Sequence, residues 1–416
     1  MKPIFNEEIK FLEEKGIELD LQEGYYWKDK QIIKCYDNQG YIHNIARLYI
    51  DDDLNITVKT YEQELFIIES WEETVKRNED KLQKLETHSI ELIKEVLKIY
   101  DNRTPVILSS GGKDSSVVSY LVKQVVSKPL TIFNNTTLDC ADTYLYIKQE
   151  YPLLIINPKE GFYPWRERSN FVGNRTARAC CGIFKEGAMV ETLNKEDKYL
   201  FFMGMRNLES NTRSGYADLW KNNKWGAREW DGVLPIRTWS EEEVWLYTLY
   251  RNIPINPKYK KGYSRVGCAI ACPYYTKSTW VLDKYWYPEM YERWHKILDK
   301  DFIENKKAPI LNCTLKEYHI HWNDTSVREE ATEEVKEEFS KITGIDRKIS
   351  DKYFDKKCSC CDKKLKKDDV GLSMKYYGRH IEKFKCTKCI SKEFGTTLKV
   401  LKGNIKDFKL QGCDLF

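Results

Sequence analysis

The first 70 residues alternate polar positions with aromatic or β-branched ones, as in GYYWKDKQIIKCYDNQGYIHNIARLYIDDDLNITVKTY. Turn-forming pairs such as Asp37-Asn38 and Gln39-Gly40 interrupt this alternation. A period of two is typical of strands with one buried face, and such pairs mark the turns between them. Residues 1–70 are therefore predicted to form a small β-rich domain.

From residue 71 the pattern becomes helical and strongly charged. Apolar residues three and four positions apart would cover one face of a helix: Leu82, Leu85, Ile90, Leu92, Ile93, Val96 and Leu97. We expect a connecting helix over residues 71–104 that leads into the main domain.

Short apolar runs then alternate with helical patterns. The runs that predict buried strands are PVILS, LTIFNN, LLIINP and YLFFMGM. Strands that alternate with helices indicate βαβ units, in which helices cover both faces of a parallel sheet. The predicted fold class is α/β, with a doubly wound parallel sheet over residues 105–310. Ser240, with Glu243 three residues later, predicts a capped helix start in this domain.

The composition indicates where the protein is located and how its cysteines are used. The chain has no run of about 18 uncharged apolar residues, and its first residues lack the apolar core of a secretion signal. We therefore expect a cytoplasmic protein without a membrane partner. Thirteen cysteines in such a chain favour metal or catalytic use over disulfides, because the cytosol keeps thiols reduced.

The net charge of +4 is unevenly distributed. Residues 351–416 contain 17 Lys and Arg against 9 Asp and Glu, which leaves residues 1–350 with a net charge of −4. Such asymmetry predicts an anionic partner for the C-terminal region, DNA or RNA in particular. A lysine-rich solvated surface is the alternative.

The segment SSGGKDSS, residues 109–116, lies between a predicted strand and a predicted helix. Its spacing differs from that of a Walker P-loop. Close backbone approach at the glycines, the positive end of the helix and the polar side chains would still hold a phosphate. The candidate phosphate ligands are Ser110, Gly111, Gly112, Lys113, Asp114 and Ser115. Asp114 would cap the helix or hold magnesium through water. An ordinary glycine turn is the alternative.

SGGKDS resembles the loop of the PP-loop ATP pyrophosphatases, specifically of the phosphoadenosine phosphosulfate (PAPS) reductase-like branch of the adenine nucleotide alpha hydrolase superfamily. Three more segments resemble that family's motifs in the same order: FNNTTLDCADT, GMRNLESNTRSG and LPIRTWSEEEVWLYTLYRNIPINPKY. The resemblance covers about residues 105–273 and extends to the ATPase of the Dnd DNA phosphorothioation system.

The resemblance implies that the loop holds the terminal phosphates of an adenine nucleotide, such as ATP with magnesium. Breaking ATP between its α and β phosphates requires stabilisation of a multiply charged leaving group. Lys113, Asp114 and Arg206 are the implied catalytic residues, and Arg206 and Arg213 suit contacts to phosphate or sulfate oxygens. A surface ion pair is the alternative for each arginine.

A first group of cysteines consists of the adjacent Cys180 and Cys181 and, 86 residues later, Cys268 and Cys272. Four thiolates can ligate a 4Fe-4S cluster, and relatives of the resembled family hold one with two cysteine pairs placed in this way. The family usually has Cys-x2-Cys where this chain has Cys-x3-Cys, so a zinc site, a bulged loop or plain buried thiols stay open. Lys185 is the expected cation beside the cluster.

A second group has the spacing of two metal knuckles: Cys358-x2-Cys361, then 24 residues, then Cys386-x2-Cys389. This spacing predicts a structural zinc in a basic zinc-ribbon module, residues 351–416, after a helical connector over residues 311–350. VGLSMKYYGRHIEKFKC predicts a hairpin between the knuckles. Cys360 or His380 could replace one ligand.

Two further features carry weaker signals. Cys413 lies near the C-terminus, where sulfonucleotide reductases carry a catalytic cysteine, but the Glu-Cys-Gly-x-His motif of that tail is absent. His319 and His321 are predicted to share one face of a strand without forming a metal site.

Three functions fit these patterns. The first is an ATP pyrophosphatase that activates a substrate for sulfur transfer, a nucleic acid in particular, with sulfur-donor or complex partner proteins. The second is an adenylylsulfate (APS) or PAPS reductase that releases sulfite. The third is a non-catalytic subunit that binds nucleotide and nucleic acid.

Overall fold

The computed structural model describes most of the chain in two compact units. The described residues are 1–62, 65–169, 172, 180–209, 216–221, 229–304, 313–323, 353–378, 381–410 and 415–416. One unit comprises Met1–Lys159 and Cys181–Tyr287, and the other comprises Glu160–Cys180 and Pro288–Phe416. In the described part of the chain, no helix combines the length and the apolar character needed to cross a membrane.

The first unit begins with an antiparallel sheet, in agreement with the predicted β-rich start. Its strands are β1 (Lys2–Pro3), β2 (Tyr26–Asp29), β3 (Ile32–Asp37), β4 (Ile42–Ile50), β5 (Ile56–Thr60) and β6 (Ile68–Glu69). They pair in the order β1-β2-β3-β4-β5, and β6 pairs with β3. Helix α1 (Asn6–Glu14) follows β1. The predicted turn after β3 is confirmed, because the Asp37 carboxylate accepts the backbone N–H groups of Gln39 and Tyr41.

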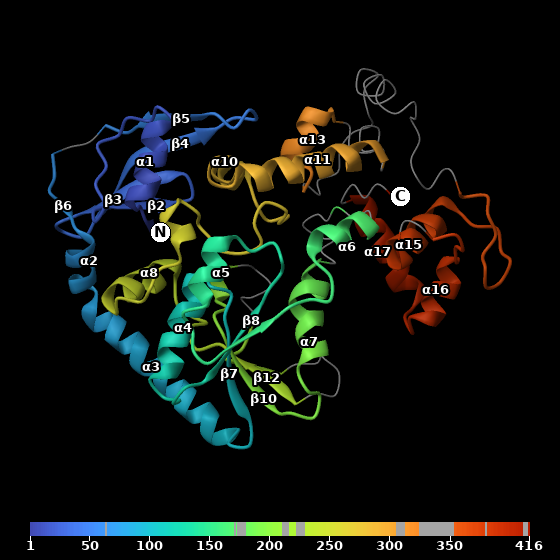
Figure 1. Ribbon diagram of the computed structural model, residues 1–416, viewed down its shortest axis with the longest axis horizontal. Coiled ribbons are helices and arrows are strands. Elements are labelled where there is room, and N and C mark those ends of the chain that lie inside the picture. The colour runs from blue at the N-terminus through green and yellow to red at the C-terminus, as the bar shows by residue number, and fades with distance from the viewer. Residues whose placement is uncertain are drawn as a thin grey trace. The chain divides into compact units, whose positions relative to one another are not determined.

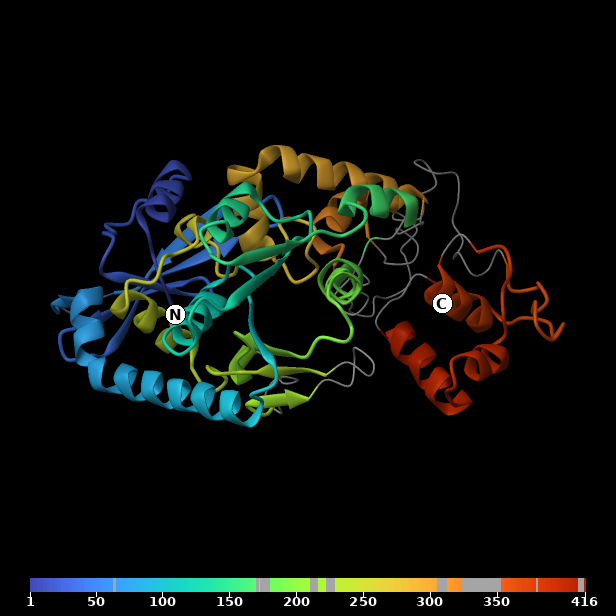
Figure 2. The ribbon, with the colours of Figure 1, turned by 60° about the horizontal axis from the view of Figure 1, so that its bottom comes forward.

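The predicted connecting helix is two helices, α2 (Trp71–Arg77) and α3 (Glu79–Ile99), which meet at Asn78. Ser70 begins α2 with a capping box in which its side chain accepts the N–H of Glu73. Leu82, Ile93 and Val96 face the core, as the apolar spacing predicted. Figures 1 and 2 show α3 running along the first unit beside α4 (Lys113–Lys123) and α8 (Glu241–Tyr250).

The main sheet has the order β11-β12-β10-β7-β8-β9. Its strands are β7 (Thr104–Leu108), β8 (Leu130–Asn134), β9 (Leu153–Ile156), β10 (Tyr199–Met203), β11 (Leu219–Lys221) and β12 (Trp230–Val233). All neighbours pair in parallel except β11 and β12. The predicted parallel α/β sheet is therefore confirmed, with one antiparallel edge strand.

Both faces of the main sheet are buried, as expected for a doubly wound fold. Ile107, Leu200 and Phe202 belong to the core that includes α3, α4 and α8. Val106 and Phe201, their neighbours in sequence, belong to the opposite core with α7 (Ala188–Thr192). This alternation follows from the period of two along a strand.

The first unit also contains α5 (Ala141–Ile147), α9 (Pro257–Lys260) and α10 (Lys277–Trp286). The capping box predicted at Ser240 is confirmed, because Ser240 Oγ accepts the N–H of Glu243 at 3.1 Å and the Glu243 carboxylate accepts the N–H of Ser240 at 2.6 Å.

The second unit is helical in its described parts: α6 (Phe162–Ser169), α11 (Pro288–Glu304), α13 (Leu315–His321), α15 (Lys367–Tyr377), α16 (Thr387–Glu393) and α17 (Leu398–Leu410). The strand predicted at His319 and His321 is wrong. A capping box of Thr314 and Glu317 begins a helix there, and His319 pairs with Asp299 of α11 at 2.6 Å. The predicted domain boundaries stay predictions.

Candidate functional site

Two parallel strands bring the glycine-rich loop and Arg206 to the same edge of the main sheet. β7 runs into the loop, and β10, its parallel neighbour, runs into the segment that carries Arg206. From β7 the order continues to β8 and β9 on one side and to β10 and β12 on the other. This edge is therefore the switch point at which open α/β sheets bind ligands.

Glycines allow the two segments to approach each other. Gly111 has a φ of 71°, and a Cβ there would lie 3.0 Å from Thr143 Cγ2. A Cβ on Gly204, directly after β10, would lie 2.6 Å from the carbonyl carbon of Asp114. Both positions therefore need glycine, and Gly204 is what lets Arg206 reach the loop.

Hydroxyl groups fix the loop from inside. Ser115 Oγ donates to the carbonyl oxygen of Gly112 at 2.8 Å, and the N–H of Ser110 lies 3.3 Å from Ser115 Oγ. The N–H of Gly111 donates to Ser109 Oγ at 3.2 Å. The loop thus has a defined backbone shape before any ligand binds.

A carboxylate holds two cations together at this edge. Lys113 Nζ lies 2.9 Å from Asp114 Oδ2, and Arg206 Nε donates to Asp114 Oδ1 at 2.5 Å. Glu241, at the start of α8, lies 3.6 Å from Lys113 Nζ. Lys113 and Arg206 are only 7% and 5% exposed. Two buried cations that share one carboxylate would both be available to an anion that displaces it.

The neighbouring charges also keep these groups ionised. Burial alone would lower the pKa of Lys113, but the negative charges of Asp114 and Glu241 raise it. Burial would likewise raise the pKa of Asp114, but Lys113 and Arg206 lower it. Each charged form is favoured by its partners more than it is disfavoured by desolvation.

The structure thus brings together Ser110, Gly111, Gly112, Lys113, Asp114, Ser115 and Arg206. Arg213 lies outside the described residues. Sequence reasoning gave no role to Asn256, Tyr259 or Glu241, which all contact the loop. The sequence contained a signal for two of them, because Asn256 and Tyr259 belong to INPKY, the end of a segment that resembles a family motif.

In the first unit, three of the four cysteines predicted to hold a cluster lie near enough to Lys185 to affect its pKa. Cys181 begins the π-helical turn η1 (Cys181–Gly187), which carries Lys185. The negative potential of Cys268 raises the pKa of Lys185; burial lowers it, and Cys181 and Cys272 raise it further. Cys180 ends a segment of the other unit. The arrangement places a half-buried lysine near these thiol groups.

The Cys-x3-Cys loop accommodates its extra residue in a tight turn. Ile270 has a φ of 59°, and the N–H of Ala271 donates to the carbonyl oxygen of Ala269 at 2.6 Å. Positive φ is uncommon for a β-branched residue. Arg265 lies near the same thiols: burial would lower its pKa, but Cys272 and Cys268 raise it. The Cys-x3-Cys segment therefore contains a turn at Ile270, and the kind of site that it forms stays a prediction.

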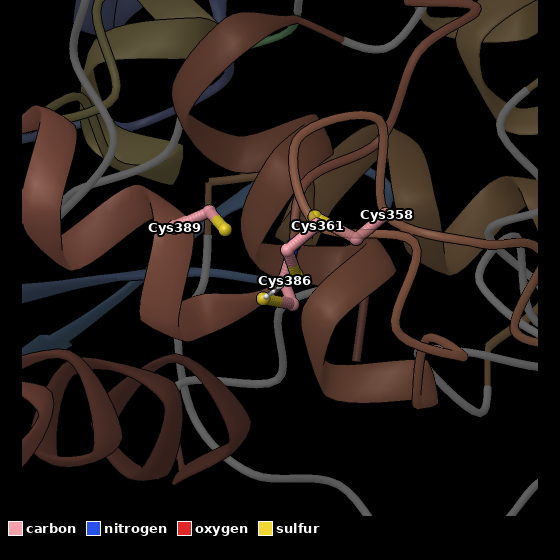
Figure 3. Close-up of side chains that lie close together, drawn as sticks. All are labelled: Cys358, Cys361, Cys386 and Cys389. Atoms are coloured by element: carbon pink, nitrogen blue, oxygen red, sulfur yellow. Dashed lines mark hydrogen bonds between the residues drawn. The ribbon is translucent and has the colours of Figure 1, made fainter.

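The C-terminal cysteines form a compact tetrad (Figure 3). The sulfur atoms of Cys358, Cys361, Cys386 and Cys389 all lie within 4.8 Å of one another, and those of Cys361 and Cys386 are 3.7 Å apart. Burial disfavours the Cys358 thiolate, but the N–H groups of Cys386, Cys360 and Cys361 lower its pKa to about 6. Tetrahedral zinc with bonds of about 2.3 Å places sulfurs about 3.8 Å apart, so this donor set fits zinc.

The hairpin predicted between the knuckles is wrong, because helix α15 lies there. Val370, Leu372 and Met374 are buried in this helix, and Gly371 and Ser373 between them are buried too. A helix buried all round loses its 3.6-residue signal. Cys360 is exposed and lies outside the tetrad, and His380 and Cys413 lie outside the described residues.

Fold and site together define an α/β protein with a glycine-rich loop at its switch point. Residues 104–273 match the phosphoadenosine phosphosulfate reductase domain, so this part of the chain is similar to that family. The family predicted from the motifs is confirmed, whereas the more specific likeness to the Dnd ATPase stays a prediction.

Individual relatives are distant. An uncharacterized protein of Methanocaldococcus jannaschii is 29% identical over 256 residues, which are 60% of this chain and 61% of the relative. An adenosine 5'-phosphosulfate reductase of Bacillus cereus is 27% identical over 170 residues, 39% of this chain and 70% of the relative. The crystal structure of a PAPS reductase from Candida auris aligns with a TM-score of 0.35 at 15% identity, over 50% of this chain and 98% of that one.

Proposed function

We propose that this protein binds the polyphosphate of ATP at the SGGKDS loop and cleaves it to AMP and pyrophosphate, activating a substrate for sulfur transfer. The observation that carries this proposal is the buried group of Lys113, Asp114 and Arg206 at the switch point. A polyphosphate would replace Asp114 as the partner of both cations, so charge developing on the leaving pyrophosphate is met by Lys113 and Arg206.

Asp114 would have a second role once Lys113 and Arg206 bind phosphate instead. Its carboxylate is then free to orient water or to help hold the magnesium ion that accompanies ATP, for which oxygen ligands are preferred. Magnesium, when bound, would neutralise phosphate charge. Glu241 is the carboxylate that would keep Lys113 ionised while Asp114 is engaged.

A 4Fe-4S cluster is the proposed cofactor of the reductase-like domain, held by Cys180, Cys181, Cys268 and Cys272. The support is that thiols of the first unit raise the pKa of both Lys185 and Arg265, because an anionic cluster needs nearby positive charge. The cluster would supply an iron site for sulfur or electron transfer. The C-terminal tetrad would hold structural zinc, which folds the knuckles and takes no part in the reaction.

Nucleic acid is the proposed sulfur acceptor, and the first knuckle is the proposed contact. Six exposed lysines stand on its two arms: Lys356, Lys357, Lys363, Lys364, Lys366 and Lys367. The arms are joined by the bridge between Lys357 and Lys364 and by the N–H of Cys358, which donates to the carbonyl oxygen of Lys363 at 2.8 Å. Neutralising Lys357 and Lys364 together should reduce the slope of log affinity against log salt by about 2.

Sulfonucleotide reduction is the second candidate, favoured by the match to the adenosine 5'-phosphosulfate reductase of Bacillus cereus. In that reaction the same cations would hold the phosphate and sulfate of APS or PAPS, and a thiol donor would release sulfite. The two candidates share a loop and differ in their products.

Product analysis of anaerobically purified protein separates the candidates. ATP is supplied with and without DNA or RNA, and APS or PAPS is supplied with a dithiol. AMP with pyrophosphate, increased by a nucleic acid, supports the proposal and identifies the acceptor. Sulfite from a sulfonucleotide, with intact ATP, would establish the reductase instead. The Lys113→Ala variant is the control, because it should lose either activity.

A further inference from the structure

The phosphate loop is held from outside by one short helical turn, α9. Asn256, its N-cap, donates from Nδ2 to the carbonyl oxygen of Gly111 at 3.0 Å. Tyr259 Oη accepts the N–H of Lys113 at 3.0 Å. Asn256 and Tyr259 are each only 2% exposed. Two backbone groups of the loop therefore depend on where α9 lies.

Four residues are too few for a helix to be stable by itself, so other groups must fix α9. The Tyr259 ring packs edge-on against Trp245 of α8, with centroids 5.0 Å apart. The end of the turn is held by the N-terminal sheet. Lys2 Nζ lies 3.4 Å from the carbonyl oxygen of Tyr259, and Lys28 Nζ donates to that of Gly262 at 3.2 Å. Cations suit the carbonyl end of a helix.

Glu8 of α1 joins these two lysines. Its carboxylate lies 2.5 Å from Lys2 Nζ and also contacts Lys28 Nζ. Lys2 and Glu8 are each 2% exposed. Burial lowers the pKa of Lys2 to about 8, against the opposing effect of Glu8. A buried charge without its partner is strongly destabilising, so each member of this triad holds the others in place.

We infer that Lys2, Glu8 and Lys28 are positioning residues through which the N-terminal sheet fixes α9 and thereby sets the affinity of the SGGKDS loop for polyphosphate. The inference rests on the proposed nucleotide site. It gives the N-terminal sheet, which lies outside the family match at residues 104–273, a role in nucleotide binding. The triad touches no substrate and acts through Asn256 and Tyr259.

Hydrogen exchange tests the link without any ligand. Tyr259→Phe removes the acceptor of the Lys113 N–H but keeps the ring against Trp245, and Lys28→Met removes one cation but keeps a long side chain. Glu8→Gln separates the triad, with Glu7→Gln, exposed on the same helix, as its control. We expect a peptide spanning residues 109–120 to exchange faster than in the wild type in all three variants. In Glu7→Gln it should exchange at the wild-type rate. If residues 109–120 exchange at the wild-type rate in folded Glu8→Gln and Lys28→Met, the inference is wrong.

Calorimetric titration with ATP and AMP then tests the consequence. We expect ATP binding to weaken about tenfold in Glu8→Gln, or about 1.4 kcal/mol, with AMP affinity unchanged. Combining Glu8→Gln with Tyr259→Phe should weaken ATP binding by less than the product of the single effects, because both act on one contact. A lower melting temperature with unchanged ATP affinity would mean that the triad only stabilises the fold. Failure of the wild type to bind ATP would contradict the proposed function. Hydrogen exchange of residues 109–120 would still show whether the triad fixes the loop.

Discussion

The reductase-like domain and the C-terminal module differ in what holds them together. The domain has two extensive apolar cores, one on each face of its sheet, and its cysteines lie outside both of them. The module has one small core that includes Cys358 and Cys386 themselves. A bound metal would therefore be an addition to the first fold and a component of the second, so its loss should leave the domain folded and unfold the module.

The largest expected effect is the loss of the module's metal. Cys386→Ser removes one sulfur from the tetrad and from the core, and structural zinc contributes on the order of 10 kcal/mol to the folding of such modules. We expect peptides from residues 353–410 to exchange completely, while those from residues 104–134 stay protected. Cys360→Ser, outside the tetrad, should behave like the wild type. Protection of the module in Cys386→Ser would show that its apolar core suffices.

Removing a cysteine from the domain should affect the cofactor and not the fold. Cys268→Ser is expected to lose bound iron and its visible absorbance but to retain zinc. The domain should still melt cooperatively, because its two cores do not involve this thiol. Metal analysis together with calorimetry measures both effects. Retained iron would contradict the ligand assignment, and an unfolded domain would contradict the comparison.

A buried carboxylate in α10 shows that the first unit tolerates an unfavourable charge. Burial raises the pKa of Asp283 to about 6, against Lys258 and the hydroxyl of Tyr263, which lower it. Because the folded form holds a proton that the unfolded form has lost, stability decreases as pH rises from about 4 to about 6. A pKa that is higher by about 2 in the folded form corresponds to about 3 kcal/mol of unfolding free energy.

Asp283→Asn removes this dependence and keeps an acceptor for Tyr263. We expect its unfolding free energy, relative to the wild type, to rise by about 3 kcal/mol between about pH 4 and about pH 7 in denaturant titrations. Parallel pH profiles for the two proteins would show that Asp283 is ionised in the fold without cost.

The smallest expected effect concerns the close approach of the segment after β10 to the SGGKDS loop. Gly204→Ala places a Cβ 2.6 Å from the carbonyl carbon of Asp114, whereas a Cβ on Gly267 meets nothing within 4 Å. Overpacking of this kind costs about 1–3 kcal/mol. We expect Gly204→Ala to lower both the melting temperature and ATP affinity, and Gly267→Ala to change neither. Equal ATP affinity in the two variants would mean that Arg206 does not depend on this contact.

The same contrast explains what could be predicted from the sequence. Strand runs such as YLFFMGM and the motif around Lys113 were informative, because buried parallel strands and anion loops have local patterns. The tetrad also followed from spacing alone. Helix α15 was not predictable, because burial on all sides removed its amphipathic period. The contacts of Lys2 with Tyr259 and of Lys28 with Gly262 join residues more than 200 positions apart, and no local pattern encodes them.

The most direct test of the account is calorimetric titration of ATP into the wild type and the Lys113→Ala variant. Lys123→Ala serves as the control, because this exposed lysine lies at the other end of α4 and pairs with Glu150. We expect the wild type and Lys123→Ala to bind ATP alike, and Lys113→Ala to lose binding while it stays folded. Equal ATP affinity in Lys113→Ala, or no ATP binding by the wild type, would contradict the claim that the SGGKDS loop holds the nucleotide's phosphates.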